Sequence, residues 1–144
     1  MTVLLDTNVV LDLLLARKPF VQEAREIFLL IENGRLAGTL CATTVTTIHY
    51  LIQKELGKRK ADETVRTLLR LFDIAQVDGS VLLEASRDEG SDYEDSVIAA
   101  AARRRSVSAI VTRDIQGFRH CDLDVMTPAE FLAFFLSTDD FPEA

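Results

Sequence analysis

The chain has 144 residues, of which 48% are hydrophobic, so it can form one domain with a sizeable core without disulfides or a structural metal. Sixteen basic and 23 acidic residues give a net charge of −7, which argues against broad, charge-driven binding to nucleic acid. Cys41 and Cys121 lie far apart and form no CxxC motif, so they indicate neither a zinc site nor a secreted disulfide framework.

The cysteine usage fits a reducing cytosol. No N-terminal stretch combines a basic region, an apolar segment and a small-residue cleavage site, and no apolar run approaches about 18 residues. We therefore expect a soluble, cytoplasmic protein without a membrane association.

Hydrophobic periodicity predicts alternating strands and helices in the first part of the chain. In chain order these are a strand, two helices, a strand, two helices, a strand and a short helix, over residues 2–5, 9–16, 20–32, 36–42, 43–56, 60–72, 74–77 and 81–87. Pro19 fits a helix start, and Gly57 fits a helix end.

A helix, a basic turn and a buried strand follow in the second part. Ser91 and Glu94 match a capping box, so we expect a helix beginning near Asp92. A strand over residues 107–112, a polar loop, a weak strand at 125–126 and a helix capped by Thr127 complete the pattern. Alternation of this kind predicts a single α/β domain over residues 1–136, with a mainly parallel central sheet and helices on both faces. Residues 137–144 are expected to form an acidic, flexible tail.

Three acids occupy positions at strand ends or on an inward-facing helix side, where a carboxylate is unexpected. Asp6 follows the first predicted strand, and Asp114 follows the strand over residues 107–112. Asp95 lies at the end of the helix face that should pack inward, where a carboxylate is costly unless it is hydrogen-bonded, paired or bound to a cation. If both strands are central and parallel, the three acids converge on one rim of the sheet.

Converging carboxylates without cysteine or histidine form a hard-oxygen site, which suits Mg²⁺ or Mn²⁺. Such a metal binds phosphate oxygens and lowers the pKa of a bound water. A purely structural interpretation also exists, in which Asp6 and Asp114 cap the turns that follow them while Asp92 and Glu94 complement a helix N-terminus. Capping alone explains the three acids together less well than it explains any one of them.

Three motifs resemble those of PIN-domain proteins, the ribonuclease fold of bacterial VapC-type toxins: LLDTNVVLDLL at residues 4–14, DYEDSVIAAAA at 92–102 and IVTRD at 110–114. Their order and spacing match from residue 2 to about residue 136. The resemblance implies a parallel sheet flanked by helices, a cluster of acids that binds Mg²⁺ or Mn²⁺, and hydrolytic cleavage of RNA. It also implies an antitoxin partner, and homodimers are common in the family.

The resemblance assigns roles by matching position. Asp6, Asp95 and Asp114 correspond to the acids that hold metal directly or through water, and Asn8 and Thr112 correspond to supporting polar positions. Glu94 or Asp92 is expected to complete the acid set, with Glu94 favoured by position, and local contacts with RNA are expected from Arg103 and Arg113.

One position departs from the family pattern. The family usually has a glutamate early in the helix after its second strand, and here Thr47 falls at that position with His49 close by. We interpret the sequence TTIHYL as typical of a subgroup that lacks this glutamate. His49 is expected to be a hydrogen-bonded helix residue, and Asp12 a solvated one.

The sequence therefore predicts a Mg²⁺- or Mn²⁺-dependent ribonuclease, the toxin of a toxin–antitoxin pair. The first alternative is a PIN-like domain with an incomplete acid set that binds RNA or a protein without cleaving. A second alternative, phosphoryl transfer through a phosphoaspartate as in receiver or haloacid-dehalogenase-like domains, is weaker. The sequence after Asp6 lacks a second aspartate two residues on, and no lysine follows Lys60.

Overall fold

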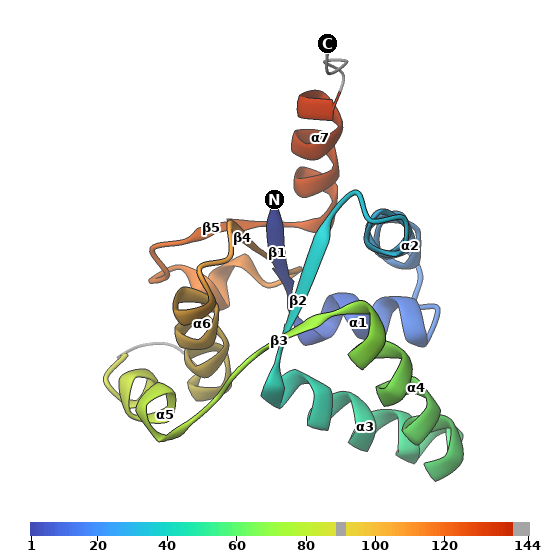
Figure 1. Cartoon of the computed structure of the whole chain (residues 1–144), viewed down its shortest axis with the longest axis horizontal. Helices are drawn as coiled ribbons and strands as arrows, with labels where there is room; N and C mark the ends of the chain where they lie inside the picture. Colours follow the sequence, from blue (N-terminus) through green and yellow to red (C-terminus); the bar gives the residue numbers. More distant parts are fainter. Residues whose placement is uncertain (89–91, 140–144) are drawn as a thin grey trace.

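The computed structural model of the chain describes residues 1–88 and 92–139. Within these residues, five parallel strands form one sheet in the order β3-β2-β1-β4-β5 (Figure 1). The strands are β1 (Thr2–Leu5), β2 (Ala37–Cys41), β3 (Asp73–Ala75), β4 (Ala109–Val111) and β5 (Asp124–Met126). The predicted fold class, a single α/β domain with a parallel central sheet, is confirmed.

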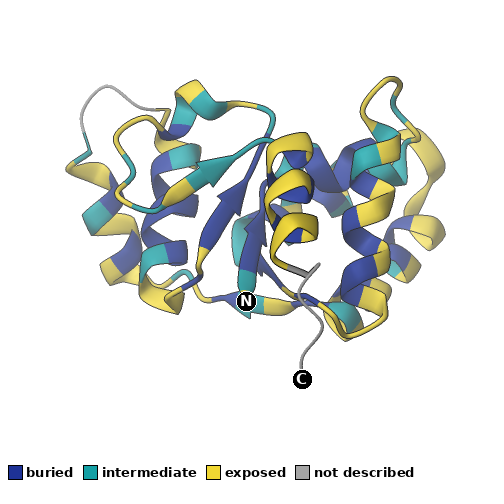
Figure 2. Ribbon diagram, turned by 90° about the horizontal axis from the view of Figure 1, so that it is seen from above, coloured by how far each residue is buried: buried dark blue, intermediate teal, exposed yellow. Residues whose placement is uncertain are grey.

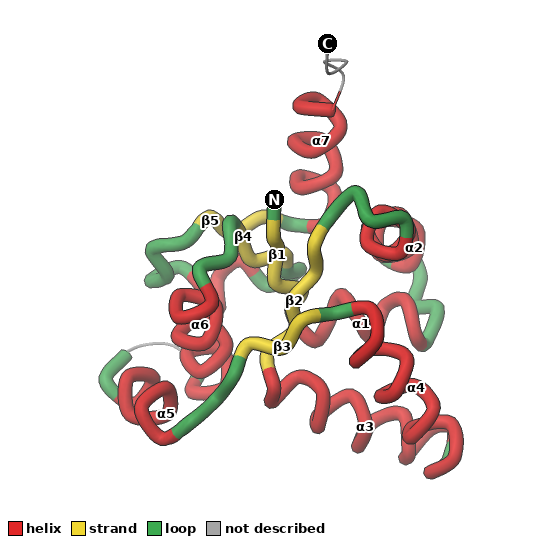
Figure 3. The backbone as a smooth tube through the Cα atoms, in the orientation of Figure 1, coloured by secondary structure: helices red, strands yellow, loops and turns green. Residues whose placement is uncertain are grey.

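The described part of the chain also has seven α-helices and one short 3₁₀ helix, of which all but the last in the chain connect the strands (Figure 3). They are α1 (Thr7–Leu14), α2 (Val21–Glu32), α3 (Ala42–Leu56), α4 (Lys58–Leu71), α5 (Gly79–Ser86), α6 (Tyr93–Arg105), η1 (Ile115–Phe118) and α7 (Pro128–Asp139). None of the described helices is both long and apolar enough to cross a bilayer.

Each predicted strand and helix is present, with shifts at the ends of the elements. Helix α1 begins at Thr7, two residues earlier than predicted, because the Asp6 carboxylate accepts a hydrogen bond from the Thr7 N–H group. Helix α7 extends to Asp139, into the segment predicted as a tail, and residues 140–144 lie outside the described residues. The predicted Ser91 cap also lies outside them, and the side chain observed to cap α6 is that of Asp92.

Side chains of the central strands alternate between two hydrophobic clusters, one on each face of the sheet. Val3 and Leu5 of β1 pack with helices α1 to α4 and α7, whereas Leu4 packs with α5 and α6. Figure 2 shows the buried residues gathered along the strands and on the helix sides that face them. Both faces are therefore covered, as parallel sheets require.

The strand order reverses direction at β1. The chain leaves β1 towards β2 on one side, and later returns to pair β4 with the other side of β1, with Leu4 opposite both Thr39 and Ile110. Crevices at such switch points, outside the carboxyl ends of the strands, are where open α/β sheets bind ligands. The residues that follow β1 and β4 therefore define where a site is expected.

Candidate functional site

Asp6 lies at the carboxyl end of β1 and is 5% exposed. Its Oδ1 atom accepts a hydrogen bond from the Thr7 N–H group at 2.8 Å, and its Oδ2 atom accepts one from the Thr112 hydroxyl at 2.7 Å. The Asn8 amide donates to the same Oδ2 atom at 3.4 Å. These donors offset the cost of burying the carboxylate and hold it in one orientation.

Thr112 and Asn8 connect the ends of the two central strands. The Thr112 hydroxyl oxygen accepts a hydrogen bond from the Asp114 N–H group at 2.9 Å, and the Asn8 side-chain oxygen accepts one from the Arg113 N–H group at 3.3 Å. The structure thus places both predicted supporting residues against Asp6 and against the backbone that carries Asp114. Their support of a metal ligand stays a prediction.

Gly117, in η1, brings the Asp95 and Asp114 carboxylates close together. A Cβ atom added at Gly117 would overlap an Oδ atom of Asp95 and lie 2.8 Å from an Oδ atom of Asp114. The Asp114 carboxylate also accepts a hydrogen bond from the Gly117 N–H group at 3.2 Å. Two acids from α6 and from the segment after β4 therefore pack on the same glycine, although they are far apart in sequence.

The pKa of Asp95 reflects this crowding. It is raised from 3.8 to about 7, first because the carboxyl is partly buried and then because of the negative charges of Asp6, Asp92, Asp114 and Glu94. Burial also raises the pKa of Asp6, the hydrogen bonds from Thr112 and Thr7 oppose this, and the charge of Asp114 adds to it. The acids therefore destabilise one another's charged forms.

Asp92 and Glu94 lie beside Asp95 at the start of α6, and both are exposed. The Asp92 carboxylate accepts a hydrogen bond from the Glu94 N–H group at 2.9 Å and caps the helix. Asp92 raises the pKa of Asp95 more than Glu94 does. Both acids are thus close enough to act on Asp95, and which of them completes the acid set stays a prediction.

The capping interpretation and the cluster interpretation both apply. Asp6 caps α1, Asp92 caps α6 and Asp114 caps η1. Capping does not account for the raised pKa of Asp95, which caps no described helix and has the other acids around it.

No group of three or more His, Cys, Asp or Glu side chains within residues 1–88 and 92–139 is arranged to hold a metal ion as it stands. The chemistry of the donor set nevertheless fits a hard divalent cation, because the donors are carboxylate oxygens that repel one another. A cation bound between them would relieve that repulsion, with water supplying further ligands.

The start of α3 approaches the site through a hydroxyl group. Thr44 is buried, and its hydroxyl lies 3.0 Å from that of Thr7, next to Asp6. Thr47 follows one turn later and is partly exposed. His49 instead pairs with Asp62 of α4 at 2.7 Å, which agrees with its predicted role as a hydrogen-bonded helix residue. No described carboxylate of α3 replaces the glutamate that the family pattern has there.

Asp12 was expected to be solvated, and this prediction is wrong. Its side chain is 1% exposed and accepts hydrogen bonds from Arg17 at 2.9 Å and from Arg113 at 2.6 and 3.1 Å. Arg17 also donates to the Asn8 carbonyl oxygen at 3.2 Å. Two guanidinium groups balance the charge of Asp12, so the carboxylate can be buried in the last turns of α1.

The two arginines proposed for RNA contact differ in position. Arg113 directly precedes Asp114 and lies at the rim, whereas Arg103 lies roughly 12 Å along α6 from Asp95, at about 1.5 Å per residue. Arg103 pairs with Glu84 at 3.3 Å and Asp122 at 3.6 Å. The structure therefore does not bring Arg103 to the acids, and the sequence suggested otherwise only because Arg103 is near Asp95 along the chain.

The roles of Gly117, Asp12 and Thr44 were not predicted from the sequence. For Asp12 a signal existed, since it follows Asn8 by one helical turn and has Arg17 nearby. For Gly117 and Thr44 no local signal existed, because their contacts involve residues distant in sequence.

The raised pKa of Asp95 predicts the pH dependence of stability in EDTA. Between pH 4 and 7 the folded chain keeps a proton on Asp95 that the unfolded chain releases, so stability falls as pH rises through this range. In Asp95→Asn this loss is expected to shrink, which urea unfolding at pH 5 and pH 8 measures. Glu63→Gln, a change at an exposed carboxylate of α4, is the control and keeps the wild-type dependence. Equal pH dependence in wild type and Asp95→Asn would contradict the raised pKa.

Gly117→Ala is expected to displace the Asp95 and Asp114 carboxylates, because its methyl group needs the space that they occupy. With the acids farther apart and more solvated, the pKa of Asp95 falls towards its ordinary value. A ¹³C NMR titration of the aspartate carboxyl groups in EDTA measures it. Gly79→Ala is the matched control, since a Cβ atom there meets nothing within 4 Å. An unchanged Asp95 pKa in Gly117→Ala would show that the glycine does not bring the acids together.

Asp12→Asn is expected to lower the free energy of unfolding by about 2 kcal/mol, because the amide cannot neutralise Arg17 and Arg113. Both guanidinium groups are partly exposed, which limits the loss. Urea unfolding at pH 7 measures it, with Glu63→Gln as the control, because exposed pairs contribute little. A loss no larger than that of the control would mean that the buried pair does not stabilise the fold.

Comparison with known proteins identifies the family. A protein-family model described as the PIN domain matches residues 2–116. No curated protein matches the chain.

Solved structures similar to the chain include three bacterial complexes. A toxin–antitoxin complex from Klebsiella pneumoniae has 20% identity and a TM-score of 0.67, covering 88% of this chain and 97% of that one. DNA-bound VapBC from Salmonella typhimurium has 18% identity and a TM-score of 0.67, covering 89% and 98%. VapBC-1 from nontypeable Haemophilus influenzae has 17% identity and a TM-score of 0.65, covering 90% and 99%.

At these identities the structural likeness shows the fold alone. The family model, however, spans most of the chain and includes Asp6, Asp95 and Asp114. The chain therefore belongs to the PIN-domain family.

Proposed function

We propose that the protein is a metal-dependent endoribonuclease and the toxin of a toxin–antitoxin pair. The observation that carries the proposal is the raised pKa of Asp95 among other acids at the carboxyl rim of the sheet. Strongly perturbed carboxylates in such a position are typical of catalytic and metal sites. Membership of the PIN family supports the same activity.

Asp6, Asp95 and Asp114 would hold Mg²⁺ or Mn²⁺, with Asp92 or Glu94 completing the set. The bound ion supplies charge to neutralise a phosphate and lowers the pKa of a water molecule. The chain's own contribution is positional. Thr112 and Asn8 fix the orientation of the Asp6 carboxylate, and Thr112 also holds the Asp114 backbone.

The partners are proposed from the family and from the neighbours. The three structures compared above are toxin–antitoxin or VapBC complexes, which supports an antitoxin protein as a partner of this chain. We propose RNA as the substrate, a cytoplasmic location and a homodimer on the basis of the family resemblance.

The second candidate function is motivated by Thr47, which stands in α3 where the family pattern has a glutamate. If Thr44 and Thr47 cannot replace that carboxylate, the domain binds RNA or a protein without cleaving it. Placement of the chain in a subgroup without this glutamate also stays a proposal.

The deciding experiment is a titration of Mg²⁺ and Mn²⁺ with a pool of structured RNAs. We expect cleavage that EDTA stops and that Asp95→Asn and Asp114→Asn each reduce on the order of 100-fold or more, since both remove a carboxylate from the cluster. Glu63→Gln, which also removes one carboxylate but lies on α4, should cleave like wild type.

Thermal unfolding separates metal binding from catalysis. Mg²⁺ should raise the melting temperature of wild type at pH 8 and raise that of Asp95→Asn much less, because a ligand that binds only the folded state stabilises it. Metal-dependent stabilisation without cleavage would favour the non-cleaving candidate. If Mg²⁺ neither raises the melting temperature nor supports cleavage, the proposal of a metal-dependent nuclease is overturned.

A further inference from the structure

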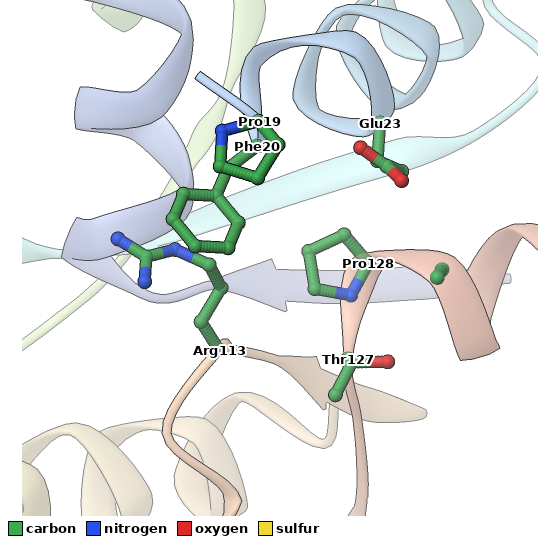
Figure 4. Close-up of a pocket in the computed structure, with 7 residues that line it drawn as sticks. Pro19, Phe20, Glu23, Arg113, Thr127 and Pro128 are labelled. Atoms are coloured by element: carbon green, nitrogen blue, oxygen red, sulfur yellow. The ribbon is translucent and has the colours of Figure 1, made fainter. Parts of the chain in front are cut away.

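A second feature lies on the same rim of the sheet as the acids. A pocket of about 470 Å³ lies between the start of α2 and the start of α7. Its lining includes Pro19, Phe20 and Glu23 on the α2 side, Arg113 after β4, and Thr127 and Pro128 on the α7 side (Figure 4). The volume is within the range of pockets that bind small organic groups, roughly 300–1,000 Å³.

The pocket offers flat surfaces that are already positioned. The Arg113 guanidinium carbon lies 3.8 Å from the centroid of the Phe20 ring, and Asp12 holds the same guanidinium through two hydrogen bonds. Phe20 is 38% exposed, so part of its ring stays accessible beside the guanidinium group. Figure 4 shows the Pro128 ring beside the Phe20 ring, with Glu23 and Thr127 near the edge of the space next to them.

Polar groups accompany the flat surfaces. The Glu23 carboxylate can accept a hydrogen bond from an exocyclic amino group. The Thr127 hydroxyl oxygen accepts a bond from the Glu130 N–H group at 3.1 Å, and the same hydroxyl is also bonded to the Glu130 carboxylate, so Thr127 shapes the edge of the pocket. A planar group with an amino edge would therefore find both a stacking surface and a hydrogen-bond acceptor in Glu23.

We propose that this pocket binds an unpaired nucleobase of the RNA, next to the phosphate that is cleaved. The inference rests on the proposed nuclease function and adds to it a recognition subsite. Proteins that bind single-stranded RNA stack its bases on aromatic rings and on arginine guanidinium planes, and both surfaces are present here.

The position of Arg113 connects the pocket to the acids. Its backbone lies between Thr112, which bonds Asp6, and Asp114, while its N–H group donates to Asn8. The side chain of Arg113 therefore lines the pocket while its backbone directly precedes Asp114. This adjacency favours a nucleotide over the side chain of a protein partner, because only a nucleotide places a phosphate next to its planar group.

Binding without cleavage tests the pocket directly. The probe is fluorescein-labelled tetra-adenylate, measured by fluorescence anisotropy in EDTA, which prevents metal-dependent cleavage. Phe20→Leu keeps an apolar side chain but removes the ring, and we expect it to weaken binding about 5- to 100-fold. Phe20→Tyr restores a ring and should bind like wild type.

Tyr50→Leu is the matched control, because Tyr50 is an exposed aromatic residue of α3 that does not line the pocket. It should leave the affinity unchanged.

Tetra-uridylate should bind more weakly than tetra-adenylate to wild type, because uracil has a smaller stacking surface and no amino group to donate to Glu23. In cleavage assays with Mg²⁺, Phe20→Leu should raise KM by a similar factor and change kcat little.

The outcomes distinguish the subsite from the nuclease activity. Binding that depends on the Phe20 ring, without any cleavage, would support the pocket and overturn the nuclease. Cleavage with an unchanged KM and unchanged affinity in Phe20→Leu would overturn the pocket and leave the nuclease intact. The proposed pocket would also be overturned if wild type did not bind the oligonucleotide, or if Phe20→Leu and Tyr50→Leu lost equal amounts of affinity.

Discussion

A carboxylate buried at the end of the central strand is the constraint on which the site depends. Asp6 must be hydrogen-bonded to be buried, and its partners come from the start of α1 and from the segment after β4. Thr112, which donates to Asp6, also accepts from the Asp114 backbone. One buried acid therefore joins the two central strands and sets the position of a second acid.

The other acids are placed against this fixed carboxylate at an energetic cost. Gly117 allows the Asp95 and Asp114 carboxylates to share one small space, and the pKa of Asp95 is raised there, first by burial and then by the charges of neighbouring acids that include Asp114. A fold selected for stability alone would separate such groups. Carboxylates crowded together at a switch point of a parallel sheet are typical of a site that binds a cation. The hydrogen bonds by which Asp6, Asp92 and Asp114 cap α1, α6 and η1 offset part of the energetic cost of placing these acids together.

A second buried acid organises the neighbouring surface. Asp12 is balanced by Arg17 and Arg113, and through Arg113 it holds a guanidinium plane against the Phe20 ring. Asp6 and Asp12 lie at the start and near the end of α1, so a single short helix supports both the acid cluster and the pocket beside it. The residues that follow β4 contact both features, Thr112 through Asp6 and Arg113 through Asp12.

The sequence by itself determined the order of strands and helices, the parallel α/β class and the positions of Asp6 and Asp114 after strands, because hydrophobic periodicity and capping signals are local. Helical periodicity in the sequence also placed Asp95 on the side of its helix that faces inward. Only the tertiary structure decided that Asp12 is buried and that Gly117 brings two acids together. It also decided that Arg103 lies away from the rim. The contact at Gly117 joins segments far apart in the chain, which no local pattern encodes. The burial of Asp12 depends on distant Arg113 as well as on nearby Arg17, and the position of Arg103 follows from its distance along α6.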